Sequence, residues 1–160
     1  MKKFELTSEF ITNIFGTKLF RIKALVTFGS VDAGDLGGYI EKESNLSHDG
    51  DAWVYGNAWV YGDAWVSGDA WVSDNARVSG DARVSGDADY AYAHGFGSVN
   101  RTTTFFRLND GGVGVRCGCF YGTLDEFREK VRETHKESNL AQEYMMLADL
   151  MEMRFQRREE

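Results

Sequence analysis

The clearest pattern along this chain is a six-residue alternation of small, polar and apolar positions that runs from Gly50 to Tyr90. In each copy an Ala is followed two residues later by a Val, except in the last copy, where Tyr90 replaces the Val. The repeated residues are Ala52, Ala58, Ala64, Ala70, Ala76, Ala82 and Ala88, and Val54, Val60, Val66, Val72, Val78 and Val84. Asp or Asn precedes every Ala, and Gly precedes that residue in every copy but one, where Asp74 stands instead. Successive copies without a gap predict a structural repeat.

Each six-residue copy has the pattern of a very short strand followed by a corner. In an extended chain the Ala and the Val point to one face, and the residue between them points to the other. These middle residues are Trp53, Trp59, Trp65, Trp71, Arg77, Arg83 and Asp89. Gly-Asp and Gly-Asn favour corners, because these residues tolerate positive φ. The period matches no small multiple of the helical period, so we expect short strands that bury their inner face by stacking on one another.

The spacing of aliphatic and small residues resembles that of the hexapeptide-repeat family. In that family an aliphatic residue is followed four positions later by a small one, as Val54 is by Ala58 and Val60 is by Ala64. The resemblance implies a left-handed parallel β-helix with about 18 residues in each coil. From this resemblance, together with the patterns of the flanking residues, we therefore expect a mainly β fold, with about three coils in residues 38–98, an N-terminal β cap, and a C-terminal β-hairpin plus two α-helices.

The residues before the repeat predict the N-terminal β cap, over residues 1–37. Lys18–Ala24 alternates polar and apolar residues like a strand, and Phe4–Ile14 is apolar enough to form a second one. Such a cap is needed because an uncovered first coil would expose a strand edge. Ile40 and Leu46 precede the first repeat Ala by twelve and six residues, so we expect them at Ala positions of an irregular first coil.

The residues after the repeat, 99–160, predict a hairpin and two helices that form a cap or an oligomerisation segment. Arg101–Leu108 and Val113–Phe120 flank Asn-Asp-Gly-Gly, which is a strong hairpin signal. Thr-Leu-Asp-Glu, starting at Thr123, predicts a capping box at the start of the first helix. Ser or Asn at positions 138–139 can cap the second helix.

Charge and composition exclude several classes of function. The formal net charge of −7 argues against a phosphate-binding surface and against direct nucleic-acid binding. No apolar run approaches the length of a membrane span, and the basic N-terminus lacks the apolar run of a secretion signal. The 2 cysteines are too few for a disulfide scaffold. We therefore expect a soluble cytoplasmic protein without a membrane partner and without a cofactor.

The outward aromatic residues are the most informative surface feature. With about 18 residues per coil, each Trp would stack on the Trp or Arg one coil further, and this alone can stabilise the ladder. Several exposed aromatic side chains together exceed the apolar patch that a monomer tolerates, so we also expect a protein interface. A stripe on the second predicted helix adds to this interface. The expected interface residues are Trp53, Tyr55, Trp59, Tyr61, Trp65, Trp71, Arg77, Arg83, Tyr144, Leu147 and Met151.

The residues that could carry chemistry favour a structural role. Enzymes with this repeat use a His as general base or three His as zinc ligands, but His48, His94 and His135 fall in separate parts of the chain. No insertion interrupts the repeat to build a substrate wall. Cys117 and Cys119 would lie on one side of a strand as small buried apolar residues. The Asp residues at the corners suit turns better than calcium binding; they are Asp51, Asp63, Asp69, Asp81 and Asp87. We therefore expect no catalytic residue and no metal site.

The flanks of the repeat carry a second resemblance. Leu19–Leu25, Ala33–Ser47 and Cys117–His135 resemble uncharacterised hexapeptide-repeat proteins of bacteriophages and prophages. Small acidic phage proteins of this kind often block a host defence system, including CRISPR effectors, by occupying a surface. The first hypothesis is therefore a non-enzymatic, phage-type binding protein with a host protein partner, located in the host-cell cytoplasm if the chain is phage-encoded.

Two other functions remain open, and a homo-oligomer is expected in any case. One alternative is an acyltransferase-like enzyme with His48 or His94 as its base. The other is a trap for a small ligand or nucleotide, in which the aromatic residues stack on a base. Flat aromatic faces self-associate unless they are charged, and closed symmetry favours a dimer slightly over the trimer that is usual in enzymes with this repeat.

Overall fold

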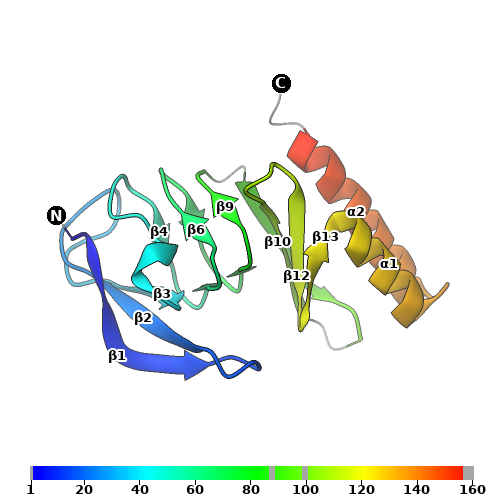
Figure 1. Cartoon of the computed structure of the whole chain (residues 1–160), viewed down its shortest axis with the longest axis horizontal. Coiled ribbons are helices and arrows are strands. Elements are labelled where there is room, and N and C mark those ends of the chain that lie inside the picture. The colour runs from blue at the N-terminus through cyan, green and yellow to red at the C-terminus, as the bar shows by residue number, and fades with distance from the viewer. Residues whose placement is uncertain (1, 87–88, 99–100, 157–160) are drawn as a thin grey trace.

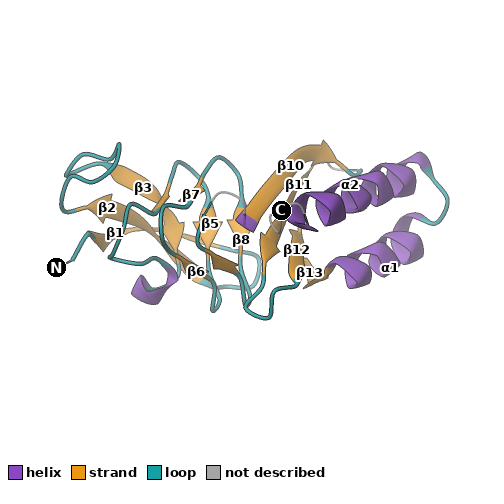
Figure 2. Cartoon of the chain, turned by 90° about the horizontal axis from the view of Figure 1, so that it is seen from above, coloured by secondary structure: helices purple, strands orange, loops and turns teal. Residues whose placement is uncertain are grey.

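A computed structural model of the chain describes residues 2–86, 89–98 and 101–156. The chain begins with a β-hairpin, continues through a stack of short strands, and ends in an antiparallel sheet covered by two helices (Figures 1 and 2). The strands are β1 (Phe4–Thr12), β2 (Lys18–Ala24), β3 (Leu36–Ile40), β4 (Trp53–Val54), β5 (Trp59–Val60), β6 (Trp65–Val66), β7 (Trp71–Val72), β8 (Arg77–Val78), β9 (Arg83–Val84), β10 (Tyr90–Phe96), β11 (Arg101–Arg107), β12 (Val113–Cys117) and β13 (Phe120–Thr123). The helices are the 3-10 helix η1 (Glu43–Asn45), α1 (Leu124–His135) and α2 (Asn139–Gln156).

The repeat forms a β-solenoid in which each short strand pairs in parallel with the third strand after it in the chain. The paired strands are β4 with β7, β5 with β8, and β6 with β9. Their registers place Trp53 beside Trp71, Trp59 beside Arg77, and Trp65 beside Arg83. This confirms the predicted stacking of the outward residues.

The inner faces of these strands form a narrow core of small and β-branched side chains. Every described Ala and Val of the repeat is buried, with an exposed fraction of at most 1%. Ala88 and Asp87, which the repeat places in the last copy, lie outside the described residues. The predicted inward orientation is therefore confirmed for the described copies. Ala suits a coil interior where strands from different sides converge, because a larger residue would overpack it.

The corners between the strands explain the Gly-Asp dipeptides. Gly56, Gly62 and Gly68 have φ of 57°, 67° and 63°, a region that a side chain disfavours. In the copy without this Gly, Asp74 adopts φ of 59°, which Asp tolerates better than most residues. A Cβ added at Gly68 would lie 2.4 Å from the carbonyl oxygen of Ser85, so the corners are also close to one another.

The first coil has a different phase from the one that the spacing suggested. Ile40 pairs with Val60 and Leu46 bridges to Val66, so both occupy Val positions and not Ala positions. More residues separate Ile40 from its partner Val60 than separate Val60 from its own partner Val78. The first coil thus contains two additional residues, and counting back in sixes from Ala52 was wrong for this reason.

The N-terminal hairpin closes the open side of the first coil. β2 pairs antiparallel with both β1 and β3, and β3 pairs in parallel with β5. The resulting sheet has the order β1-β2-β3-β5-β8, so the hairpin extends one face of the solenoid. The predicted strands at Lys18–Ala24 and from Phe4 onward are present, and they cover an edge that would otherwise be unpaired.

Trp53 is buried beneath this N-terminal segment and is only 1% exposed. Its ring packs in T-shaped arrangements with Phe4 and Phe28, with centroids 6.4 Å and 5.3 Å away. It still points away from the Ala–Val core, since it lies between Ala52 and Val54 in an extended strand. The expectation of an exposed Trp53 was wrong because the N-terminal residues fold back over its face of the coil.

The other end of the solenoid is covered by a four-stranded antiparallel sheet with the order β10-β11-β12-β13. The predicted hairpin is β11 and β12, whereas β10 and β13 were not predicted, so this sheet begins at Tyr90 and not near residue 99. On one face Thr104 accepts a hydrogen bond from the backbone N–H of Arg77, and Phe106 joins the solenoid core. On the other face Phe105 packs on the helices.

The two helices cover the outer face of this sheet (Figure 2). Thr123 caps α1 with the predicted capping box, because its Oγ1 accepts from the N–H of Glu126 and Glu126 Oε1 accepts from the N–H of Thr123. The Ser138 hydroxyl accepts a hydrogen bond from Ala141 N at the start of α2. These contacts confirm both predicted helices and orient their apolar stripes toward the sheet.

We expect Trp53→Ala to lower the free energy of unfolding by about 3–5 kcal/mol, because it removes a large ring from a closed aromatic contact. Trp65→Ala is the matched control, since Trp65 occupies the same repeat position but is 44% exposed. It should cost less than about 1 kcal/mol. Urea unfolding of both variants checks this, and equal losses would contradict the burial of Trp53 described here.

Lys3 joins the N-terminal segment to the first coil. Its Nζ donates hydrogen bonds to the carbonyl oxygens of Gly50 and Ala52, at 3.2 Å and 2.7 Å, and lies over the ring of Phe28. Burial lowers the pKa of Lys3 to about 8, and the nearby Asp51 and Asp49 oppose this shift only in part. The charged form of Lys3 is therefore disfavoured in the folded chain.

The stability of the wild type should rise with pH relative to Lys3→Met. Between pH 8 and pH 10.5 the unfolded chain holds a proton on Lys3 that the folded chain has released. Stability increases with pH wherever the unfolded state binds more protons. Urea unfolding from pH 7 to pH 10 should show the difference growing in favour of the wild type by about 1–2 kcal/mol, allowing for solvent screening. A difference that stays constant over this range would show that Lys3 titrates normally in the fold.

Candidate functional site

Five of the expected interface residues are buried inside the chain, with at most 9% of each exposed, which is too little for a protein interface. Besides Trp53, Tyr61 packs with Leu19 and Tyr39 beneath the N-terminal hairpin. Tyr144, Leu147 and Met151 of α2 face the sheet and α1. The stripe on α2 was correctly identified as apolar, but the four-stranded sheet is larger than the predicted hairpin and covers it. These residues therefore stabilise the fold.

The other outward residues of the repeat lie on different faces of the solenoid. Trp71 is exposed beside the half-buried Tyr55, with ring centroids 5.1 Å apart. Trp65 is exposed on another face, in the rung that it shares with Arg83. Trp59 is half-buried beneath Arg77, whose guanidinium lies 3.9 Å from the ring centroid. The three ladders lie on separate faces, as the predicted pairs require, and Tyr55 and Trp71 remain together on the face that was expected to be flat.

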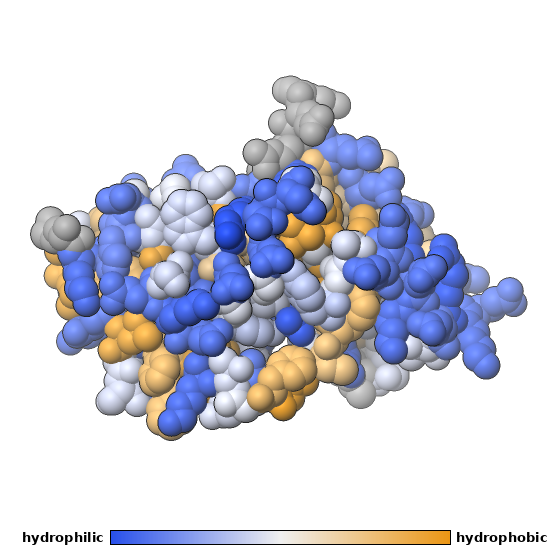
Figure 3. Space-filling model, viewed as in Figure 1, coloured by the Kyte–Doolittle hydropathy of each residue, from blue (hydrophilic) through white to orange (hydrophobic). Residues whose placement is uncertain are grey.

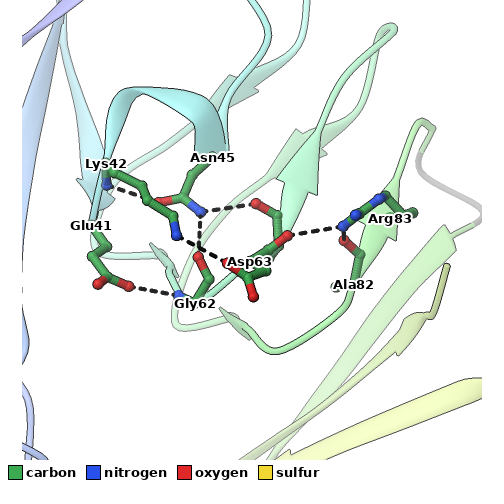
Figure 4. Close-up of polar contacts among 8 residues, drawn as sticks. Glu41, Lys42, Asn45, Gly62, Asp63, Ala82 and Arg83 are labelled. Carbon is green, nitrogen blue, oxygen red and sulfur yellow. Dashed lines mark hydrogen bonds and ion pairs between the residues drawn. The ribbon is translucent and has the colours of Figure 1, made fainter.

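The corner next to Trp65 is a polar network that joins successive coils (Figure 4). The buried Asn45 donates from Nδ2 to the carbonyl oxygens of Gly62 and Ala64, at 3.1 Å and 2.8 Å. Lys42 pairs with the Asp63 carboxylate at 3.0 Å, and Arg83 donates to the Asp63 carbonyl oxygen at 2.9 Å. These bonds satisfy backbone oxygens at the corner, so Arg83 has a structural role here.

A second apolar stripe lies on the outward side of α2. Met146, Leu150 and Met153 are 72%, 55% and 68% exposed. Their spacing of four and three residues places them on one side of the helix. Sequence reasoning chose the inward stripe and missed this one, although the same spacing was visible in the printed sequence.

One cleft brings together residues that are far apart in the sequence, and we call it the arginine cleft. It has a volume of about 340 Å³ and lies between the β1–β2 turn, the solenoid and the C-terminal sheet. It is lined by Asn13, Ile14, Phe15, Trp59, Tyr61, Arg77, Arg101, Thr102, Arg116, Gly118 and Cys119. In Figure 3, hydrophobic side chains gather at the lower edge of the molecule, where Figure 1 places the β1–β2 turn.

The arginine cleft is cationic although the whole chain is acidic. Its lining contains Arg77, Arg101 and Arg116 but no Asp or Glu. None of these arginines forms an ion pair with a carboxylate in the described part of the chain. Burial lowers the pKa of the Arg77 guanidinium from its usual value, which is the cost of a cation that is removed from water without a counter-charge. The net charge of the whole chain could not predict that this cleft is cationic.

Arg116 is the most buried of the three arginines, at 9% exposure. Its Nε donates to the hydroxyl of Ser79 at 3.0 Å. Its guanidinium lies 5.6 Å from the ring centroid of Phe15, 5.4 Å from that of Tyr61 and 5.0 Å from that of Tyr121. The aromatic rings offset part of the cost of burying the charge, but a carboxylate would offset more.

Asn13 adds an unsatisfied donor to the lining of the arginine cleft. It is 8% exposed, and its Oδ1 accepts hydrogen bonds from the backbone N–H groups of Phe15 and Thr17, at 2.9 Å and 3.0 Å. Its Nδ2 is buried and has no hydrogen-bond partner among the described residues. Buried donors without partners are rare in folded proteins, so this amide is suited to an acceptor that enters the cleft.

The histidines lie apart, and each contacts a different structural neighbour. His48 stacks on Phe4, with centroids 4.3 Å apart, and accepts from the backbone N–H of Lys3 through Nδ1. His94 Nδ1 lies 2.7 Å from the hydroxyl of Thr102, and the ring of His135 lies near Tyr144. His135 lines a second cleft together with Cys117, Cys119 and Lys130, where its ring contact is with Tyr144. The three histidines are not brought together in one site, which favours the structural interpretation.

Cys117 and Cys119 do not lie on one side of a strand as the sequence suggested. Cys117 ends β12 and Cys119 precedes β13, with Gly118 at φ of 60° in the turn between them. Cys119 is exposed and Cys117 is half-buried, so the expectation of two buried thiols was wrong.

Within the described residues, no group of three or more His, Cys, Asp or Glu side chains could hold a metal ion. In the same residues, no helix has both the length and the hydrophobicity that a membrane crossing requires.

Comparison with known proteins supports the solenoid and says nothing about its function. A family model described as the YdcK beta solenoid repeat matches residues 52–68 and 70–86. Trp71 pairs with Trp53 in the parallel ladder. The second match begins as many residues after the first as Trp71 lies after Trp53, so the two matches correspond to successive coils. A search of curated proteins returned no match. The repeat is thus similar to known β-solenoid repeats, and its surfaces must be interpreted from their own chemistry.

Proposed function

We propose that this chain is a non-enzymatic binding protein that acts through contacts with another protein. The observation that carries this proposal is the placement of large apolar side chains at the surface. The repeat core and the helix–sheet interface are closed, yet Trp65, Trp71, Met146, Leu150 and Met153 are exposed. Exposed apolar side chains that gather on a rigid element are typical of protein interfaces.

The direction and number of the coils, and the kind of partner, are proposed from the two sequence resemblances. The hexapeptide-repeat pattern supports a left-handed coil direction and about three coils. The resemblance of the flanks to phage proteins supports a host protein as partner, and the inhibition of a host defence system, such as a CRISPR effector, as the outcome. In that setting the protein would work in the host cytoplasm, where a rigid scaffold can occupy a surface without any chemistry.

An acyltransferase is the main rival function. It requires a His that can take a proton beside a bound thioester. His48 lies against Phe4 with both ring nitrogens near hydrogen-bond partners, since Nε2 is 3.0 Å from Glu43. His94 is exposed on β10, outside the lining of the arginine cleft. These positions favour the binding protein, and turnover of acetyl-coenzyme A by the purified chain would favour the enzyme.

We propose that the outward stripe of α2, made of Met146, Leu150 and Met153, binds a second copy of this chain. α2 packs one apolar stripe on its own sheet and carries the other on its outer side. The outer stripe can pair with the same stripe of a second copy around a two-fold axis. Such a dimer leaves Trp65, Trp71 and the arginine cleft accessible, because they lie on other elements. A dimer is therefore compatible with a separate protein partner.

Leu150→Lys should convert the wild-type dimer into a monomer at micromolar concentration, because it places a charge in an apolar interface. Leu36→Lys is the matched control, since Leu36 is 57% exposed, Leu150 is 55% exposed, and Leu36 lies on β3, which is far from α2 (Figure 1). Light scattering after size-exclusion chromatography measures the molar mass of all three proteins. A monomeric wild type, or a Leu150→Lys variant that stays dimeric, would contradict this interface.

A further inference from the structure

We propose that the arginine cleft is a binding site for a small phosphate-bearing molecule with a flat ring, of about the size of a mononucleotide. This inference is independent of the protein contacts proposed above, because it concerns other residues and another class of ligand. It also departs from the expectation that net charge sets, since an acidic chain here presents a cationic cleft.

The need for an anion follows from the unpaired guanidiniums. Arg77 is half-buried and donates from NH1 to the backbone oxygens of Asn57 and Asn75, so its known bonds are all to neutral groups. Arg116 is nine-tenths buried and bonds to a neutral hydroxyl. Arg101 borders the same cleft. Buried cations are normally paired with anions, and guanidinium groups match the geometry of phosphate oxygens.

The unpartnered amide of Asn13 is a second and independent indication of a ligand. Its Oδ1 is fully used in the β1–β2 turn, which fixes the side chain and leaves Nδ2 as a donor without an acceptor among the described residues. A phosphate oxygen that enters beside Arg116 can accept from such a donor. Because a fixed donor needs little reorganisation on binding, it favours affinity for an acceptor of the right shape.

The flat ring and the size follow from the remaining walls of the cleft. Phe15 lines the cleft and is 57% exposed, whereas Trp59 lies beneath Arg77 and Tyr61 is buried beside Arg116. An exposed ring such as that of Phe15 can stack on a nucleobase and tolerates different bases, because every base has a π-face. The volume of about 340 Å³ suits one small molecule and excludes a polymer within the cleft itself.

Isothermal titration calorimetry with AMP, GMP, CMP and UMP, each tested separately, is the direct experiment. We expect at least one of them to bind the wild type, and the matching nucleoside and inorganic phosphate each to bind at least about tenfold more weakly. These comparisons separate the contribution of the phosphate from that of the ring. The proposal is overturned if none of the four binds at about 1 mM, or if the nucleoside or inorganic phosphate binds as tightly as the nucleotide.

Asn13→Asp is the most informative variant. It keeps the oxygen that accepts from Phe15 and Thr17, and it replaces the free donor by a negatively charged oxygen. Binding of the nucleotide should weaken by at least about tenfold, while thermal unfolding monitored by circular dichroism shows that the chain still folds. Asn109→Asp makes the same chemical change at an exposed position outside the cleft and should leave binding unchanged.

Arg101→Gln provides a second test that does not depend on the turn. Arg101 is exposed at the rim of the arginine cleft, so its loss should weaken nucleotide binding with little effect on folding. Arg132→Gln is the matched control, because Arg132 is likewise exposed and lies on α1, outside the lining of the cleft. If both Asn13→Asp and Arg101→Gln fold and bind the nucleotide as tightly as the wild type does, the site is not in this cleft.

Discussion

The stacking of Ala and Val side chains along the parallel ladder is the interaction on which the rest of this structure depends. Each strand of the repeat is two residues long, so it cannot bury an inner face or satisfy its backbone groups alone. Parallel pairing supplies the hydrogen bonds, as from Trp53 N to the carbonyl oxygen of Ala70 at 3.0 Å. The coil interior excludes water only because Ala and Val are small enough to meet there.

A ladder of this kind has two open ends, and the two caps follow from that constraint. β2 covers the edge of β3 at one end, and β11 lies across the last described coil at the other. Both caps contribute residues to the arginine cleft, which therefore exists only because the ends are closed. The site and the stability of the scaffold share the same contacts, as in the case of Arg116, which reaches from the C-terminal sheet to Ser79 of the solenoid.

Local sequence patterns predicted what local interactions decide. The inward Ala and Val, the positive φ at the corners and the capping box at Thr123 were all visible in short stretches. The phase of Ile40 was not, because the two additional residues lie in an irregular corner without a pattern. The burial of Trp53 and the assembly of the arginine cleft depend on segments that are far apart in the sequence, which periodicity in one stretch cannot reveal.

Substitution of Ala70 by Leu tests the central claim most directly, because Ala70 lies fully buried in the ladder core. The extra side-chain atoms should overpack the coil and lower the free energy of unfolding by about 1–3 kcal/mol. Trp71→Leu changes the neighbouring outward residue and should cost clearly less, since Trp71 is exposed. Urea unfolding of the two variants decides the matter. A larger loss for Trp71→Leu than for Ala70→Leu would contradict a core built from the Ala and Val positions.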